Sequence, residues 1–396
     1  MKICIISHEY PPNIISGLGT ALVNLVKGLQ NHEITIITPL VRGGKEHEKS
    51  GNLEIVRLPI FKSSLLQKFN LIDPRILFSL KLRKFRKSFD FTKFDILHIY
   101  DVHDSYFLDK SITDKVPVII SVNDFYSYII SWNPLKFPYP TKNLPARYFH
   151  YSLTKVLNKH FLKKSKYVLT NTQFLKKILM EKCNLPPEKI FHTYRGLDVS
   201  KFGKNPKNKY TSKKILYLGS NMERKGVIYL IKALPEICKK YPEATCTLIG
   251  KSTPSLMKEF NKIIKKNNIE KNVTFIPYVP SENIPKYYQE ANVFVLPALF
   301  ENLAVTLLEA MASKTPVVCT EDGANTEAVE DKKQGYVIRS KSAEEITNAV
   351  CKILEDPKKA EEMGILGYKK LQSTFARETM TKKVYQLYQK IRREHE

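Results

Sequence analysis

The alternation of short apolar runs with helical patterns most limits what this chain can fold into. In the first half, strand-like runs are interleaved with helix-forming segments: KICIIS, EITIIT, DILHIY, VPVIISV and KYVLTN. A second set then starts afresh: KKILYLG, ATCTLIG, VTFIPYV, VFVLP, PVVCT and GYVI. This alternation predicts an α/β protein whose parallel sheets are covered by helices.

The two sets of strands predict two doubly wound, Rossmann-like domains. A chain of 396 residues is also too long for one ordinary core. The polar stretch KFGKNPKNKYTSKK predicts a linker near 205–211. We therefore expect domains at 1–205 and 206–375, facing one another across a cleft because such sheets bind ligands beyond the carboxyl ends of their strands. A final amphipathic helix at 376–396 is expected to leave the second domain, with its apolar face formed by Val384, Leu387, Tyr388 and Ile391.

Composition limits the classes of molecule that the chain is expected to bind. A net charge of +25 favours polyanions such as nucleic acid, anionic lipid or phosphorylated ligands. No RNA-binding or helix-turn-helix pattern accompanies the charge, which makes nucleic acid a disfavoured partner. The sequence has neither an apolar run of transmembrane length nor a basic leader, so we expect a cytoplasmic protein. Its six cysteines are scattered, which indicates neither a metal site nor a disulfide framework.

One segment is densely basic and has apolar residues at helical spacing. Over Arg75–Phe89 the apolar positions are Phe78, Leu82, Phe85 and Phe89. The cations that could meet an anionic membrane surface are Lys81, Arg83, Lys84, Arg86 and Lys87. The pattern predicts a basic amphipathic helix. A peripheral membrane helix and a surface helix packed on its own domain both fit this pattern.

The first strand leads into a glycine-containing turn and then a helix. Gly17 and Gly19 stand at this junction, where glycine permits close approach of another molecule and the helix offers free N–H groups. Leu22 occupies the position of a third glycine, which disfavours a dinucleotide site. An ordinary tight turn explains the pair as well.

The second domain opens in the same way, with Arg224, Lys225 and Gly226 directly before a helix. Two cations at a helix N-terminus favour a phosphate group through charge, dipole and free amides. The order of residues is not that of a P-loop. Solvated surface cations are the alternative.

Two carboxylates lie in the apolar segment LFENLAVTLLEAMA. Glu301 is expected to precede a helix, and Glu309 to end its second turn. Carboxylates accept paired hydrogen bonds from vicinal hydroxyls, which sugars and riboses carry, so both can approach one elongated polar ligand. Helix capping with a structural ion pair is the alternative.

Taken together, these stretches resemble the family 4 glycosyltransferases, retaining enzymes with the two-domain GT-B fold. The resemblance follows the family order over nearly the whole chain: YPPNIISGLG, RGLDVSKF, LGSNMERKG, the paired glutamates, AMASKTPVV and GANTEAVEDKKQGYVI. It implies a hexosyltransferase whose donor is a nucleoside diphosphate sugar.

The resemblance also implies roles for individual residues. Lys225 matches the lysine that binds the donor diphosphate, Glu301 the acid on the transferred sugar, and Glu309 the acid on the ribose. The expected catalytic residues are Lys225, Glu301 and Asn123. The other expected donor-binding residues are Gly17, Gly19, Ser220, Arg224, Tyr278, Val279, Leu303, Ala304 and Val305.

This chain departs from the family pattern at several of these positions. Ser220 stands where the family commonly has arginine, and Arg224 lies close enough in sequence to substitute for it. Asn123 stands where the family has histidine; it can donate a hydrogen bond but does not titrate near neutral pH. Asn302 and Ala304 replace glycines, and Arg195 replaces an asparagine.

We expect transfer of a hexose to a glycan or lipid-linked acceptor near a membrane face, as in cell-surface polysaccharide, glycolipid or lipid-linked oligosaccharide synthesis. The basic segment Arg75–Phe89 motivates this location. Without a DxD-type cluster, we expect a metal-independent reaction that needs no cofactor. A non-catalytic GT-B-like protein that binds nucleotide sugar or glycan is the alternative.

Overall fold

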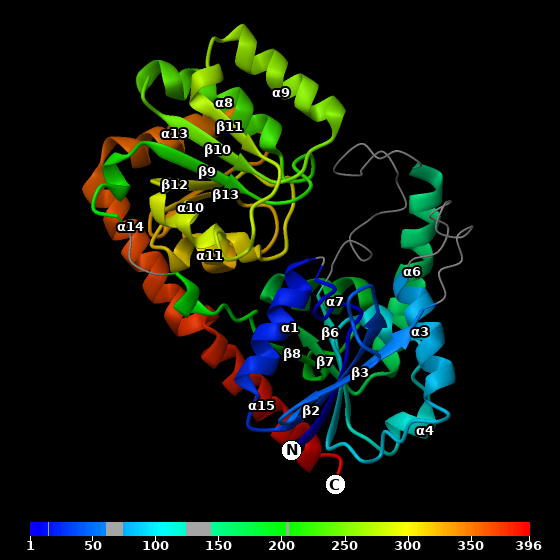
Figure 1. The fold of residues 1–396 in the computed structure, drawn as a ribbon. Coiled ribbons are helices and arrows are strands. Elements are labelled where there is room, and N and C mark those ends of the chain that lie inside the picture. The colour runs from blue at the N-terminus through cyan, green and yellow to red at the C-terminus, as the bar shows by residue number, and fades with distance from the viewer. Residues whose placement is uncertain (15, 61–73, 124–143, 203–205) are drawn as a thin grey trace. The chain divides into compact units, whose positions relative to one another are not determined.

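The computed structural model describes residues 1–14, 16–60, 74–123, 144–202 and 206–396 (Figure 1). Contacts between Cα atoms divide the chain into two compact units. Unit 1 consists of Met1–Gly196 and Arg377–Glu396, and unit 2 of Leu197–Ala376.

The described part of unit 1 contains an eight-stranded sheet in the order β3-β4-β2-β1-β5-β6-β7-β8. Its strands are β1 (Lys2–Ile6), β2 (Glu33–Leu40), β3 (His47–Ser50), β4 (Leu53–Pro59), β5 (Ile96–Ile99), β6 (Val118–Val122), β7 (Tyr167–Thr170) and β8 (Ile190–His192). Its helices are α1 (Gly17–Gly28), α3 (Pro74–Phe85), η1 (Val102–Ser105), α4 (Lys110–Thr113), α6 (Leu144–Lys164), α7 (Gln173–Cys183), η3 (Pro187–Lys189) and α15 (Arg377–Arg393). The pairings are parallel apart from the antiparallel β3–β4 pair.

Unit 2 contains a parallel six-stranded sheet in the order β11-β10-β9-β12-β13-β14. Its strands are β9 (Lys214–Leu218), β10 (Thr245–Ile249), β11 (Val273–Ile276), β12 (Val293–Leu296), β13 (Val317–Thr320) and β14 (Gly335–Ile338). Its main helices are α8 (Val227–Lys240), α9 (Pro254–Lys266), α10 (Ile284–Glu290), α11 (Val305–Ala312), α12 (Asn325–Ala328), α13 (Ala343–Glu355) and α14 (Pro357–Lys370). The predicted fold class, two doubly wound parallel-sheet units, is confirmed.

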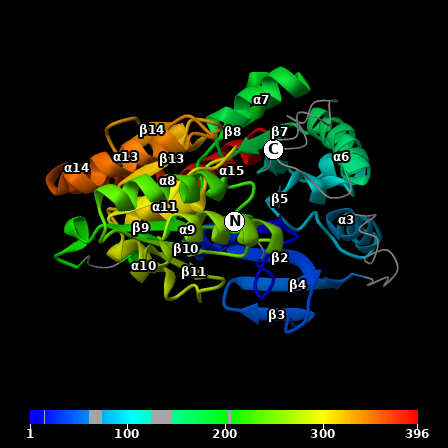
Figure 2. The ribbon, with the colours of Figure 1, turned by 90° about the horizontal axis from the view of Figure 1, so that it is seen from above.

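Burial on both faces explains why the central strands are continuously apolar. Ile3, Ile5 and Ile36 are fully buried beneath α1 and α15. The opposite side of the unit 1 sheet carries α3 and α6, with β5 lying between them and α15 (Figure 2). Parallel sheets occur almost always with both faces covered, and their strands therefore lack the polar alternation of half-exposed sheets.

The C-terminal helix α15 packs closely on α1 in unit 1. Its buried side chains are Met380, Val384, Leu387, Tyr388 and Ile391. A Cβ atom on Gly28 would lie 2.0 Å from Thr381 Oγ1, so only glycine permits this approach.

The chain passes between the units twice, and the two passages run side by side. In unit 2, Leu197 pairs with Ala376 in an isolated bridge, and its N–H donates to Phe375 O over 2.9 Å. In unit 1, a Cβ atom on Gly196 would lie 2.7 Å from Arg377 Cα. The two segments are thus in contact on both sides of the boundary.

The basic helix predicted over Arg75–Phe89 is α3, which ends earlier, at Phe85. The chain turns there, and Phe89 stacks on Phe85 with ring centroids 4.8 Å apart. Phe78 and Leu82 are fully buried, so this face packs on its own unit. No helix of the described residues has the length and apolarity needed to cross a membrane.

Lys209, in the polar stretch where the sequence predicts a linker, is buried in unit 2. Its Nζ donates to Tyr288 O at 2.7 Å, Gln289 O at 3.0 Å and Thr315 Oγ1 at 2.9 Å. Burial lowers the pKa of Lys209 to about 7. The Lys209 side chain therefore joins the start of unit 2 to the C-terminal end of α10 and to Thr315.

We expect Lys209→Met to lower the free energy of unfolding by about 1–3 kcal/mol, because the partly buried Gln289 carbonyl loses this donor. Urea denaturation of the full chain measures the change. Lys207→Met is the matched control, since Lys207 is exposed and two residues away. Equal stability of the two variants would contradict the anchoring role.

Candidate functional site

The loop that follows β9 brings two cations to the carboxyl edge of the unit 2 sheet. It begins at Gly219 and leads into α8 through Gly226, whose φ of +62° is left-handed. A Cβ atom on Gly226 would lie 2.1 Å from Pro297 O, directly after β12. Leu299 N–H also donates to Arg224 O over 3.1 Å. The loop is thus fixed against the neighbouring strand end.

Arg224 and Lys225 converge on the carboxylate of Glu301. Arg224 Nη1 lies 3.1 Å from Glu301 Oε2, and Lys225 Nζ donates to the same oxygen. The exposed fractions of the Lys225 and Glu301 side chains are only 10% and 12%. Burial lowers the pKa of Lys225, and Glu301 opposes that shift. The predicted sugar-binding acid and diphosphate-binding lysine therefore occupy one largely desolvated cluster.

The backbone of Glu301 is held by Gly323, which the sequence analysis did not single out. Glu301 N–H donates to Asp322 O at 3.3 Å, and Ala324 N–H donates to Glu301 O at 3.0 Å. Gly323 has φ of +106°, and a Cβ atom there would lie 1.8 Å from Glu301 O. The glycine within EDGAN was the available signal, because this position excludes any side chain.

Glu309 lies on α11 and is oriented by Tyr288, whose hydroxyl donates to Glu309 Oε2 at 2.9 Å. Burial raises the pKa of Glu309 to about 7, and the Tyr288 hydrogen bond acts in the opposite direction. Tyr288 is fully buried on α10. Its role was missed because the paired tyrosines of IPKYYQE do not reveal which one faces inward.

The N-terminus of α11 follows Glu301, as the sequence predicted. Val305 is its first residue, Ala304 is its N-cap, and no side chain caps it. Ala304 N–H donates to Asn325 Oδ1 over 3.4 Å, so one predicted donor-binding amide already has a protein partner. Leu303 is buried directly before it. The ligand contacts of these three amides stay a prediction.

Other predicted donor-binding residues also lie at this edge of the sheet. Ser220 is exposed just after β9. Tyr278 and Val279 follow β11; the tyrosine is 72% exposed, and the valine is buried. Within the described residues, no group of three or more His, Cys, Asp or Glu side chains could hold a metal ion.

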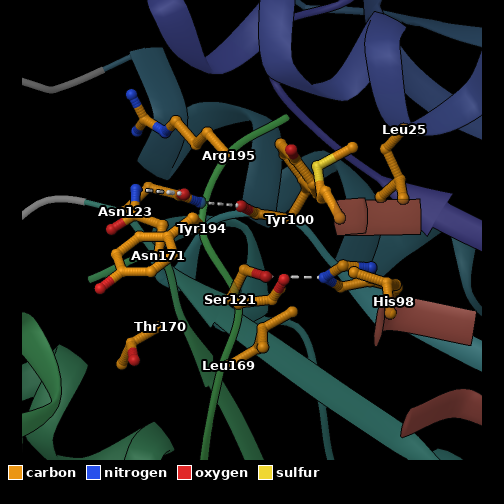
Figure 3. A pocket seen from close by; sticks show the side chains of 13 residues that line it. Leu25, His98, Tyr100, Ser121, Asn123, Leu169, Thr170, Asn171, Tyr194 and Arg195 are labelled. Atoms are coloured by element: carbon orange, nitrogen blue, oxygen red, sulfur yellow. Dashed lines mark hydrogen bonds between the residues drawn. The ribbon is translucent and has the colours of Figure 1, made fainter. Parts of the chain in front are cut away.

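In unit 1, Asn123 lies at the carboxyl end of β6 in a pocket (Figure 3). Its Nδ2 donates to Tyr100 O at 2.6 Å, and its Oδ1 accepts from Asn171 Nδ2 at 3.1 Å. His98 lines the same pocket, where burial lowers its pKa to about 3, and bonds Ser121 Oγ at 2.7 Å. The pocket therefore presents neutral polar groups beside Arg195, whose guanidinium group points away from His98.

The glycine turn of unit 1 is occupied by a carboxylate of the chain itself. Glu9 Oε2 accepts from Ser16 N–H at 3.0 Å and from Gly19 N–H at 3.2 Å. Gly17 starts α1 between these two contacts. Glu9 was missed because it stands apart from the glycines in the sequence. Its carboxylate therefore already binds the N–H group of Gly19, one of the expected donor-binding residues.

Comparison with known proteins agrees with this geometry. The family model described as Glycosyl transferases group 1 matches residues 199–370, and the Glycosyltransferase Family 4 model matches residues 15–201. The alpha-monoglucosyldiacylglycerol synthase of Acholeplasma laidlawii is 25% identical over 418 aligned positions, covering 98% of this chain and 96% of that protein.

Solved structures share the fold across both units. The sucrose-phosphate synthase of Thermosynechococcus elongatus has a TM-score of 0.79 at 18% identity, covering 98% of each chain. Anabaena Alr3699/HepE in complex with UDP-glucose has a TM-score of 0.73 at 16% identity, covering 98% of this chain and all of that one. These features define a GT-B glycosyltransferase. The chain belongs to the group 1 glycosyltransferases.

The raised pKa of Glu309 predicts a pH-dependent stability. Between its unfolded value near 4.5 and its folded value of about 7, the native state holds more protons, so stability falls as pH rises. Relative to Glu309→Gln, which does not titrate, the natural chain should lose up to about 3 kcal/mol between pH 5 and 8.

Urea denaturation at several pH values tests this expectation. Glu282→Gln, at an exposed carboxylate, is the control and should follow the natural chain. Parallel stability curves for the natural chain and Glu309→Gln would contradict the raised pKa.

Proposed function

We propose that the protein is a retaining hexosyltransferase that moves a sugar from a nucleoside diphosphate donor to a glycan or lipid-linked acceptor. The observation that carries the proposal is the cluster of Arg224 and Lys225 on Glu301 at the carboxyl edge of the unit 2 sheet. Membership of the group 1 glycosyltransferases supports the reaction class.

The chemistry requires a group that stabilises a departing phosphate. As the anomeric C–O bond breaks, negative charge grows on the diphosphate while the sugar becomes oxocarbenium-like. Lys225 and Arg224 supply fixed positive charge in a site with little water, where it acts more strongly than in bulk solvent. We assign Glu301 to the sugar hydroxyls and Glu309 to the ribose.

The two cations also motivate our proposal that the reaction needs no metal. They provide the charge that a divalent ion supplies in other sugar-transfer sites. Retention is proposed to follow front-face attack, with the donor phosphate accepting the proton of the acceptor hydroxyl. Asn123 is proposed to hydrogen-bond the transferred sugar through its amide.

The relatives suggest classes of donor and acceptor. The Anabaena neighbour was solved with UDP-glucose, which supports a test of UDP-hexoses first. The Acholeplasma relative is named for a glucosylated diacylglycerol, which supports a lipid acceptor, within the wider proposal of surface polysaccharide or glycolipid synthesis.

We expect Lys225→Ala to lower the rate of transfer or of slow donor hydrolysis by about 100- to 1,000-fold, the usual effect of losing one contact to developing charge. Release of nucleoside diphosphate from a panel of UDP- and GDP-hexoses, with EDTA present, measures it. Lys239→Ala, at an exposed lysine in the last turn of α8, is the control.

The same assay separates the enzyme from its alternative. Donor binding by the natural chain, detected as a thermal shift, with no diphosphate release and no transfer would favour a nucleotide-sugar-binding protein. Activity that vanishes in EDTA and returns with Mg²⁺ would overturn metal independence.

We further propose that the exposed cations of α3 and the following turn meet an anionic membrane surface. Arg86 serves another purpose, because it donates to Phe107 O at 3.1 Å and pairs with Asp109. Arg83, Lys84 and Lys87 are exposed, and Leu80 beside them is 53% exposed. Lys81, also predicted for this surface, is partly buried.

Vesicle flotation tests this surface. Replacing Arg83, Lys84 and Lys87 by Gln should lower binding to vesicles rich in phosphatidylglycerol, because each cation near such a surface adds favourable energy. The control replaces the exposed Lys45, Lys49 and Lys182 by Gln. Binding that ignores anionic lipid content, or equal binding by both variants, would remove the proposal.

A further inference from the structure

A cavity of about 480 Å³ lies in unit 1 and is lined by residues other than the predicted catalytic and donor-binding ones. It is bordered by the start of β6, the start of β7, α4 and the last turn of α6. Its volume falls in the range of roughly 300–1,000 Å³ that is typical of small-molecule sites. Asn123 follows the opposite end of β6, so the cavity lies at the amino edge of the sheet and the predicted sugar site at the carboxyl edge.

The floor of the cavity is apolar. Val118 and Ile120 alternate along β6 and therefore project from one face of the sheet. Ile119 between them projects from the other face and packs in the core with α1 and α15. Phe161 of α6 and Leu108 complete the apolar wall. Water in such a space gains few hydrogen bonds, which favours an apolar occupant.

Cations border the same cavity. Three exposed lysines line it, so their ammonium groups stay hydrated at its edge: Lys110, Lys164 and Lys166. Two acids, Asp109 and Asp114, oppose them there.

The acid nearest to these lysines in sequence is already paired. Asp109 forms an ion pair with Arg86 and accepts a hydrogen bond from Ser111 Oγ at 2.5 Å. These contacts keep the pKa of Asp109 below its ordinary value. Glu394 is a further acid near this edge, because its carboxylate accepts from Tyr167 Oη at 2.8 Å and its backbone oxygen from Lys166 Nζ at 3.4 Å. With Asp109 balanced by Arg86, three lysines outnumber Asp114 and Glu394, and the edge carries net positive charge.

We propose that this cavity binds a single-chain amphiphile with an anionic head group. Its alkyl chain lies against Val118, Ile120 and Phe161, and its carboxylate or phosphate meets the ammonium groups of Lys110, Lys164 and Lys166. The site is separate from the proposed sugar-transfer reaction and does not depend on it.

Titration calorimetry of the full chain tests the proposal, with dodecanoate and dodecyl phosphate as probes below their micelle concentrations. Dodecyltrimethylammonium has the same chain with a cationic head. We expect both anionic probes to bind at one site and the cationic probe to bind at least about tenfold more weakly, since a tenfold change reports differential head-group recognition. Tighter binding of dodecanoate assigns the site to fatty acids, and tighter binding of dodecyl phosphate assigns it to lipid phosphates.

Two variants test whether the anionic probes bind in this cavity. Replacing Lys110, Lys164 and Lys166 by Gln alters exposed side chains only and should weaken binding of the anionic probes by about tenfold or more. Val118→Phe should abolish it by filling the space, with folding checked by circular dichroism. The variant of Lys45, Lys49 and Lys182 is the matched control and should bind as the natural chain does. Equal affinity for the cationic probe, or unchanged binding in the lysine variant, would overturn the proposal.

Discussion

The proposed chemistry depends on one carboxylate, Glu301, shared by two cations in a nearly dry environment. Removing water from three charged groups is costly, and the attraction between them offsets that cost only when the geometry is good. Arg224 and Lys225 both reach Glu301 Oε2, so the arrangement holds positive charge close to the acid that we propose to bind the sugar. When a donor phosphate approaches this cluster, the two cations would exchange one anionic partner, Glu301, for another. Neither cation would then need to lose more water.

Two left-handed backbone positions hold this cluster in place. Gly226 ends the cationic loop against Pro297 O, and Gly323 lies against Glu301 O. At both glycines a Cβ atom would clash with the neighbouring carbonyl oxygen. The loop after β9 and the segment after β12 are therefore held by direct contacts between backbone atoms. The cations and the acid are therefore positioned mainly by main-chain packing, and side-chain rotamers contribute the final approach.

The strand and helix pattern predicted the fold class because the central strands of both sheets are buried on two faces, which requires a continuous apolar run in each of them. Pattern alone could not find contacts that join distant segments. Glu9 caps α1 across a turn, Tyr288 reaches Glu309 from another helix, and Lys209 is buried within a stretch as polar as a linker. Such partners are fixed by packing in three dimensions, and a polar residue gives no local sign of being enclosed. The proximity of Lys225 to Glu301 was predicted through the family resemblance, whereas the sharing of one oxygen by Arg224 and Lys225 emerged only from the coordinates.

The paired passages of the chain have a mechanical consequence. Gly196 and Arg377 are in contact within unit 1, and Leu197 and Ala376 form a bridge within unit 2. Both covalent connections between the units are thus in contact with one another where they cross the boundary. A backbone change in either connection would therefore act directly on the other, because the two segments are in contact.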